Sequence, residues 1–210
     1  MASPTRRPQL ASGTPTWLLP AAVASVAAGW LARRSTIGRV LTLPAMAVAG
    51  GALWFFRDPE RSTDEAGVIS SADGVVQSID VCPDGRTRVA VFMNPLNVHV
   101  NRAPLKGTVT SLTHRPGGYL PAFNKDSERN ERMVWHFDTE IGDVEVIQIA
   151  GVLVRRIVPY LSVGDAVERG QRIGLIQFGS RVDIYLPEGV EPAVKVGDKT
   201  LAGVTRLDRG

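Results

Sequence analysis

The chain has 210 residues, enough for one domain of ordinary size and an accessory segment. Its formal net charge of +3 is small and its basic residues are dispersed, which argues against a nucleic-acid partner and suits contact with an anionic membrane. The single cysteine, Cys82, excludes an intramolecular disulfide and a zinc site built from several thiolates.

The N-terminal quarter of the chain predicts a tail followed by two apolar helices. Residues 1–16 are rich in Ser, Thr, Pro and Arg, which is typical of a disordered tail. The nearly uncharged stretches 17–32 and 40–56 are somewhat shorter than the roughly 20 residues of a membrane-spanning helix. A cleaved signal peptide is the alternative, but the second apolar stretch and the aromatic and basic run 54–57 favour a retained membrane hairpin. We therefore expect residues 17–56 to associate with a membrane.

The region from residue 57 to residue 210 predicts a mainly β domain. Short β-branched runs alternate there with Gly, Pro and Asp turn signals, and no long amphipathic helix pattern interrupts them. These runs are 88–93, 107–112, 133–137, 144–149, 151–158, 172–177 and 182–186. The segment 163–174 resembles the hairpin of lipoyl-like or biotinyl-like domains, in which glycines allow strands to cross between sheets. The expected architecture is therefore a barrel-sandwich-like (lipoyl-like) β domain.

The histidines offer few candidates for imidazole chemistry. Strand alternation would place Asn97, His99 and Asn101 on one face and apolar residues on the other, forming either a polar site wall or a solvated face. His136 lies among large apolar neighbours, which indicates a structural role, and His114 precedes a loop sequence and is expected to be exposed. No two histidines have the short spacing of metal ligands on one element, so we predict no metal site.

Three further segments have ordinary structural explanations when each is taken alone. Asp73-Gly74 at a strand entry is typical of a turn, and Gly179-Ser180 is too. The cluster 130–132 either places an ion pair in a cavity or decorates a surface. None of these segments indicates a function by itself.

Taken in order, these segments resemble the phosphatidylserine decarboxylase family, and most closely its short form in bacteria and archaea. The resemblance rests on Asp73-Gly74, the polar segment around His99, residues 129–132 and the late Gly179-Ser180, and it covers about residues 54–190. Segments 55–59 and 137–139 add to the match.

Two departures from the longer family members concern the site itself. Arg102 occupies the place of a second histidine that the longer members carry shortly after the first. Their cleavage motif reads Leu-Gly-Ser-Thr, whereas Phe178 and Arg181 flank the Gly-Ser pair in this chain.

The resemblance implies that the chain cuts itself between Gly179 and Ser180. Ser180 Oγ would attack the Gly179 carbonyl carbon, with His99 as the base and Asp73 orienting that base. β-Elimination and loss of ammonia would leave a covalent pyruvoyl group at position 180. The products would be a large chain and a small chain of 31 residues (210 − 180 + 1), held together as a heterodimer that assembles further.

The resemblance also implies the reaction: decarboxylation of phosphatidylserine to phosphatidylethanolamine, with the pyruvoyl group as electron sink and His99 as proton donor. Asn97, Asn101 and Arg102 are candidates for binding the substrate. The expected partners are the phospholipid and the membrane, without nucleic acid, metal or diffusible cofactor. The expected location is the cell membrane, with the catalytic domain on the cytoplasmic side.

Two other classes of protein are alternatives for this sequence. A membrane-anchored lipoyl-like adaptor without catalytic activity has no need for a fixed Gly-Ser bond, and it usually carries coiled-coil arms that this sequence lacks. A zinc endopeptidase built on a lipoyl-like domain needs histidines in close pairs. An intact-mass measurement separates these classes, because only the decarboxylase predicts scission between Gly179 and Ser180.

Overall fold

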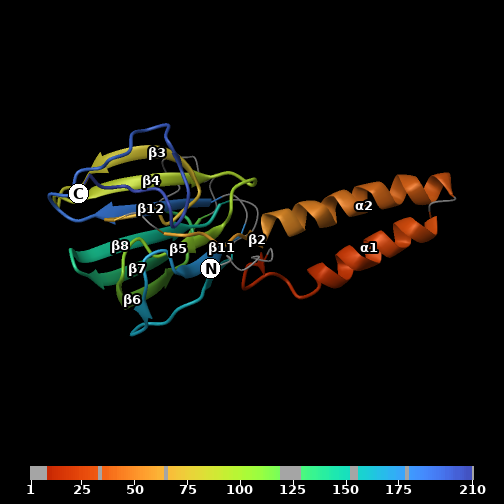
Figure 1. The fold of residues 1–210 in the computed structure, drawn as a ribbon, viewed down its shortest axis with the longest axis horizontal. Coiled ribbons are helices and arrows are strands. Elements are labelled where there is room, and N and C mark those ends of the chain that lie inside the picture. The colour runs from red at the N-terminus through yellow and green to blue at the C-terminus, as the bar shows by residue number, and fades with distance from the viewer. Residues whose placement is uncertain are drawn as a thin grey trace, which may run out of the picture. The chain divides into compact units, whose positions relative to one another are not determined.

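The computed structural model describes residues 9–32, 35–63, 66–118, 129–151, 156–177 and 180–209. The chain divides into two compact units, Met1–Glu60 and Arg61–Gly210. The first unit is mostly helical and the second consists of β-strands (Figure 1).

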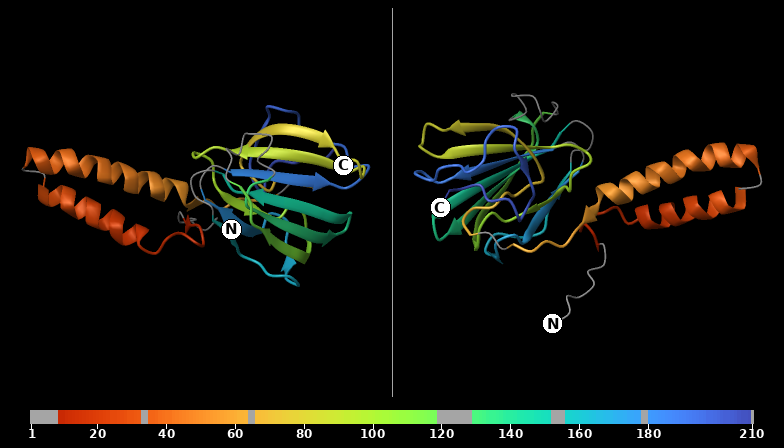
Figure 2. Two further views of the ribbon diagram at one scale, coloured as in Figure 1. Left: turned by 180° about the vertical axis from the view of Figure 1, so that it is seen from behind. Right: turned by 45° about the horizontal axis from the view of Figure 1, so that its top comes forward.

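The first unit is a helical hairpin closed by a short sheet. Helices α1 (Leu18–Ala32) and α2 (Thr36–Phe55) run side by side in opposite directions (Figures 1 and 2), and β1 (Gln9–Leu10) pairs antiparallel with β2 (Arg57–Asp58). Alanine-rich sequence favours α1. Gly29 allows the two helices to approach, since a Cβ there would lie 2.7 Å from the Thr42 Cγ2 atom. Of the predicted tail, residues 1–8 lie outside the described residues.

The hairpin carries large apolar side chains on its exposed surface. Val23, Trp30 and Val48 are exposed, the last by 74%. Within the described residues, neither helix combines the length and apolarity needed to cross a membrane. The predicted hairpin is therefore present as two packed helices, whereas its association with a membrane stays a prediction.

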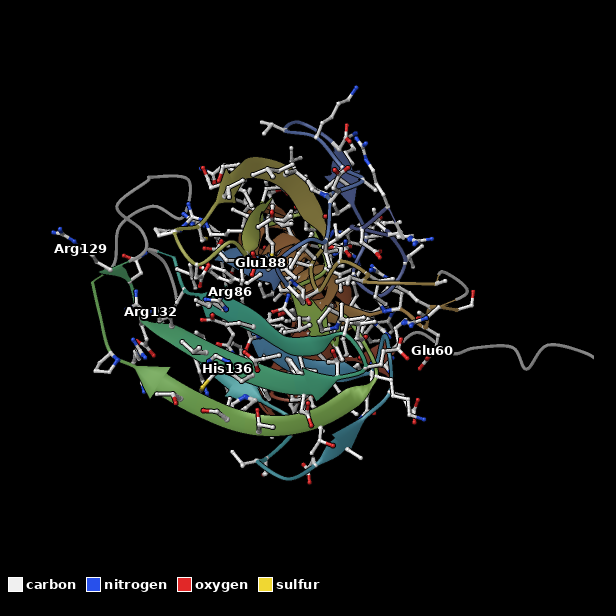
Figure 3. The ribbon with its side chains drawn as sticks, turned by 90° about the vertical axis from the view of Figure 1, so that its left-hand side faces the viewer. Glu60, Arg86, Arg129, Arg132, His136 and Glu188 are labelled. Carbon is white, nitrogen blue, oxygen red and sulfur yellow. The ribbon has the colours of Figure 1, made fainter. Side chains whose placement is uncertain are left out.

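The second unit contains a curled sheet of eight antiparallel strands in the order β10-β6-β7-β8-β12-β4-β3-β13, whose curvature is visible in Figures 2 and 3. A second sheet of three strands has the order β5-β11-β9. The strands are β3 (Gly74–Val81), β4 (Thr87–Met93), β5 (Val100–Arg102), β6 (Gly107–Arg115), β7 (Arg132–Thr139), β8 (Gly142–Ile149), β9 (Ile157–Pro159), β10 (Ala166–Val167), β11 (Arg172–Ile176), β12 (Ser180–Leu186) and β13 (Lys199–Thr200).

The core lies on one face of the curled sheet, where alternate residues of each strand point inward. Trp135 and Phe137 of β7 stack there with ring centroids 5.9 Å apart. The alternate residues of β12, Val182, Ile184 and Leu186, are fully buried in the same core. The prediction of a mainly β fold is confirmed.

The hairpin predicted at 163–174 changes sheets, as expected. Its first strand, β10, pairs with β6 of the curled sheet, and its second strand, β11, pairs with β5 of the smaller sheet. Gly170 lies between them with φ of +76°, a conformation that glycine adopts without strain. For the strand predicted at 151–158, residues 152–155 lie outside the described residues and β9 begins at Ile157.

Candidate active site

Ser180 is the first residue of β12, which lies between β8 and β4 near the middle of the curled sheet. It pairs with Met93 of β4, and its side chain shares the inward face with Val182. Ser180 is fully buried, and its hydroxyl makes no hydrogen bond to any residue that the structure describes. Buried hydroxyls almost always have a partner, and among the described residues the Ser71 hydroxyl shares this unusual state with Ser180. Gly179, the other predicted cleavage residue, lies outside the described residues.

His99 is buried completely in the segment between β4 and β5. Its Nδ1 atom lies 3.0 Å from the Asn97 carbonyl oxygen, and a carbonyl can only accept, so Nδ1 carries the proton. In the neutral ring, Nε2 then holds the lone pair that a general base requires. The His99 carbonyl oxygen accepts a hydrogen bond from the Ile176 amide at 3.2 Å, which ties this segment to the strand leading toward Ser180.

Asp73 is held by an arginine that the sequence analysis did not single out. Arg61 donates two hydrogen bonds to the Asp73 carboxylate, at 2.5 and 2.8 Å, and the Ala202 amide donates a third at 2.8 Å. Within the described chain, Arg61 and the Ala202 amide are the hydrogen-bond donors to the Asp73 carboxylate. The His99 ring is instead oriented by the Asn97 carbonyl. The structure thus does not bring Asp73 and His99 together as a hydrogen-bonded pair.

Asn101 belongs to a buried network of amides rather than to an open surface. Its Oδ1 atom accepts a hydrogen bond from Gln148 Nε2 at 2.7 Å, and its Nδ2 atom donates to the Ser71 carbonyl at 3.2 Å. The Trp135 indole completes the network by donating to Gln148 Oε1 at 2.7 Å. Asn101 Nδ2 also lies 3.8 Å from the sulfur of Met93, the pairing partner of Ser180.

Gln148 and Trp135 were not predicted as part of the site, although the sequence contains one signal for them. In β8, Gln148 stands where alternation requires an apolar residue facing the core. A polar side chain at such a position needs a buried partner, and the structure supplies two.

The other two residues predicted to bind substrate, Asn97 and Arg102, form hydrogen bonds within the protein. Asn97 closes a turn, because its side-chain oxygen accepts a hydrogen bond from the Asn94 amide at 2.8 Å. Arg102 is 5% exposed, and its guanidinium donates to the Gly170 carbonyl at 2.9 Å. Substrate contact by these residues stays a prediction.

The predicted strand is shorter than the sequence pattern indicated, and the alternative of a solvated polar face is wrong. β5 covers only Val100–Arg102, and every residue from 98 to 102 is buried. Asn97 lies in the turn that precedes β5, and the strand itself is held at its edges, where β11 pairs with it and the Arg102 amide donates to the Ser71 carbonyl.

The described residues after position 179 are hydrogen-bonded to the rest of the second unit at several places. β12 is bonded to β8 on one side and β4 on the other. Near the C-terminus, the Ser70 amide donates to the Thr205 carbonyl at 2.7 Å, and the Leu207 amide donates to the Val68 carbonyl at 2.7 Å. A cut before Ser180 would therefore leave these bonds in place.

Comparison with known proteins places the chain among close relatives. A family model described as phosphatidylserine decarboxylase matches residues 50–207. A phosphatidylserine decarboxylase proenzyme of Streptomyces avermitilis is 64% identical over 207 residues, 99% of this chain and 96% of the relative. A proenzyme of the same name from Thermobifida fusca is 63% identical over 202 residues, 96% of this chain and 93% of the relative. A Methanosarcina acetivorans protein, provisionally named archaetidylserine decarboxylase proenzyme, is 46% identical over 201 residues, 93% of this chain and 94% of the relative. The chain belongs to the phosphatidylserine decarboxylase family.

Proposed function

We propose that this protein is a pyruvoyl-dependent decarboxylase that converts phosphatidylserine to phosphatidylethanolamine after cutting itself before Ser180. The observation that carries the proposal is the Ser180 hydroxyl, fully buried and without a hydrogen bond in the described chain. It occurs in a chain that is 64% identical to a phosphatidylserine decarboxylase proenzyme.

In the proposed maturation, Ser180 Oγ bonds to the Gly179 carbonyl carbon while the amide bond between the two residues breaks. The proton leaves the hydroxyl and the Ser180 nitrogen gains one, which yields an ester. His99 is the proposed base, because its Nδ1–H bond to the Asn97 carbonyl leaves Nε2 as the acceptor. Elimination then releases the Gly179 carboxylate, and hydration with loss of ammonia gives a pyruvoyl group.

We propose that Asp73 contributes by anchoring the structure around the site, and not by a direct hydrogen bond to His99. Its bonds to Arg61 and to the Ala202 amide anchor the segment 70–73. The Ser71 carbonyl of this segment accepts hydrogen bonds from the Asn101 side chain and from the Arg102 amide. This anchoring would hold Asn101 in place, whose amide nitrogen lies 3.8 Å from the sulfur of Met93, the pairing partner of Ser180. Asp73 also joins the two future chains directly, since Ala202 lies after the proposed cut.

The residues around position 180 suit a pyruvoyl group. Its methyl group would be the former Ser180 Cβ, at the fully buried position that shares the inward face with Val182, and its ketone oxygen would take the place of the Ser180 nitrogen. The group supplies a ketone that binds the substrate amine and withdraws electrons as carbon dioxide leaves. His99 can then deliver a proton to the former α-carbon, and the walls of the site exclude water. Asn97, Asn101 and Arg102 remain the proposed substrate contacts.

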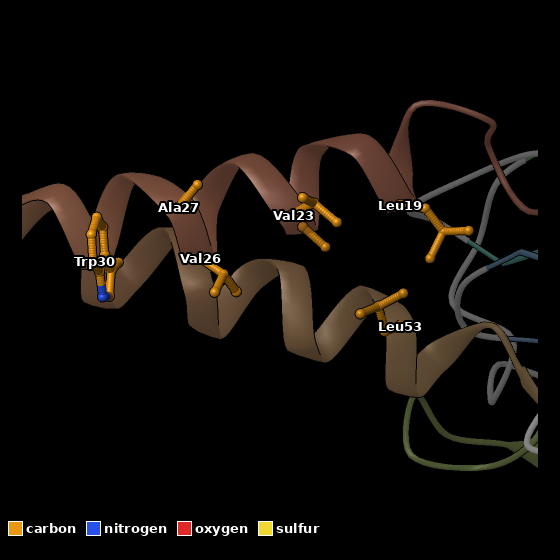
Figure 4. Close-up of a pocket in the computed structure, with 7 residues that line it drawn as sticks. Leu19, Val23, Val26, Ala27, Trp30 and Leu53 are labelled. Atoms are coloured by element: carbon orange, nitrogen blue, oxygen red, sulfur yellow. The ribbon is translucent and has the colours of Figure 1, made fainter.

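We further propose that the helical hairpin holds the protein on the cell membrane, with the second unit on the cytoplasmic side. An apolar groove between α1 and α2 is lined by residues that include Leu19, Val26 and Trp30 (Figure 4). Trp54 is exposed beside Arg57, whose guanidinium lies 4.1 Å from the indole ring centroid. This pair suits the membrane interface. Phe55 and Phe56, predicted as part of the same anchor, are buried.

Intact-mass measurement tests the proposed function. The wild-type chain should separate into two chains. The smaller one should be lighter, by one ammonia, than the same peptide with an N-terminal serine. Ser180→Ala should stay in one piece and release no carbon dioxide from phosphatidylserine. His99→Ala should slow processing by roughly 10²- to 10⁴-fold, the usual contribution of a positioned base. An uncut, folded wild-type chain would instead favour the adaptor.

A further inference from the structure

A second cavity lies on the outward face of the curled sheet, opposite the face that carries Ser180. Its volume is about 230 Å³, and strands β6, β7, β8 and β12 line it. Strand alternation places Asp183 and Tyr185 on this face, because Ser180 and Val182 point into the core. Figure 3 shows Arg132, which also lines the cavity, on β7.

The two carboxylates that line the cavity are already neutralised. Asp183 is 1% exposed and accepts two hydrogen bonds from Arg181, each 2.6 Å long. Glu145 accepts a hydrogen bond from Arg86 at 2.7 Å. Neither carboxylate therefore contributes free negative charge to the cavity.

The positive charge of the cavity comes from two arginines that lie directly opposite each other. Arg115 ends β6 and Arg132 begins β7, and the two are register partners. Like charges at such a position destabilise a sheet. Neither arginine forms an ion pair with a carboxylate in the described part of the chain. The neighbouring acid, Glu131, is instead bonded to His114 at 3.0 Å.

We propose that this cavity binds a phosphate group, carried either by an anionic lipid headgroup or by a soluble phosphate. Two guanidinium groups offer the planar forks that suit phosphate oxygens, and a bound anion would remove their repulsion. The cavity is smaller than the sites of drug-sized ligands, about 300–1,000 Å³, and so takes a headgroup rather than a whole lipid.

Tyr185 adds a neutral donor to this site. Burial raises the pKa of its phenol to about 12, so the hydroxyl keeps its proton in neutral solution. The cavity is on the opposite face of the sheet from Ser180, so the proposed ligand is an effector or an anchoring lipid and not the reacting substrate.

The test is thermal unfolding of the full chain in neutral detergent, with Ser180→Ala present throughout to keep the chain intact. One arm adds inorganic phosphate against chloride at matched ionic strength. The other adds micelles containing phosphatidylglycerol against micelles of phosphatidylcholine. We expect a saturable rise in the unfolding midpoint in at least one arm. Arg115→Gln and Arg132→Gln should bind roughly tenfold more weakly, since each removes charge-assisted hydrogen bonds.

Arg209→Gln is the matched control, because Arg209 forms a well-exposed surface ion pair with Glu191. It should respond to phosphate as the parent protein does. A response to inorganic phosphate alone identifies a soluble ligand, a response to phosphatidylglycerol alone identifies a headgroup, and a response in both arms shows that the site binds phosphate from either source. Without anion, Arg115→Gln and Arg132→Gln should melt no lower than the parent. A clear fall without anion, an equal response in all variants, or no response in either arm overturns the proposal.

Discussion

The Arg61–Asp73 ion pair gives the sharpest test of how the site is organised. Asp73→Asn keeps an oxygen for the Ala202 amide but removes the charge that Arg61 faces. The two side chains are only 11% and 6% exposed, so the orphaned guanidinium should cost about 3 kcal/mol or more. At about 2–4 °C per kcal/mol for a domain of this size, the unfolding midpoint should fall by roughly 10 °C.

A double variant separates anchoring from direct chemistry. In Arg61→Met/Asp73→Asn no charge is orphaned, so most of the lost stability should return. If Asp73 acts by position, self-cleavage should slow in the single variant and recover in the double variant. Stability is measured by thermal unfolding with Ser180→Ala, and cleavage by gel and intact mass with Ser180 present. If the double variant recovers stability but still does not cleave itself, the positional role of Asp73 is refuted. Asp73 would then act directly on His99.

Four other outcomes follow, three from contacts in the second unit and one from an open position in α2. Gln148→Leu leaves the Trp135 indole and a buried amide without partners, so the free energy of unfolding should fall by about 2–4 kcal/mol in chemical denaturation. Gly174→Ala should also destabilise, by about 1–3 kcal/mol, because a Cβ there meets a backbone carbonyl at 2.8 Å. Gly50→Ala, with nothing within 4 Å, should be neutral or stabilising. Tyr185 should ionise near pH 12 in an ultraviolet titration. Its folded pKa is raised, so its stabilising contribution is complete below about pH 10 and is lost as the pH rises toward 12. A normal titration would contradict its burial.

Strands and helices with a regular local pattern could be predicted from the sequence alone. Alternation of β-branched residues predicted β4, β7, β8 and β12, and two uncharged stretches predicted the helices. The strand pattern failed for residues 97–99, which precede β5, and alternation did not report that every residue from 98 to 102 is buried. Gln148 also broke the pattern of β8, yet its partners belong to other strands.

The amino-acid order by itself determined the mainly β fold, the helical hairpin, and Ser180 and His99 as candidates for chemistry. Only the tertiary structure decided that Ser180 is sealed in the core, that Arg61 rather than His99 holds Asp73, and that two arginines face each other across β6 and β7. The reason is physical: periodicity follows from neighbouring residues, whereas pairing register and burial depend on strands that are distant along the chain.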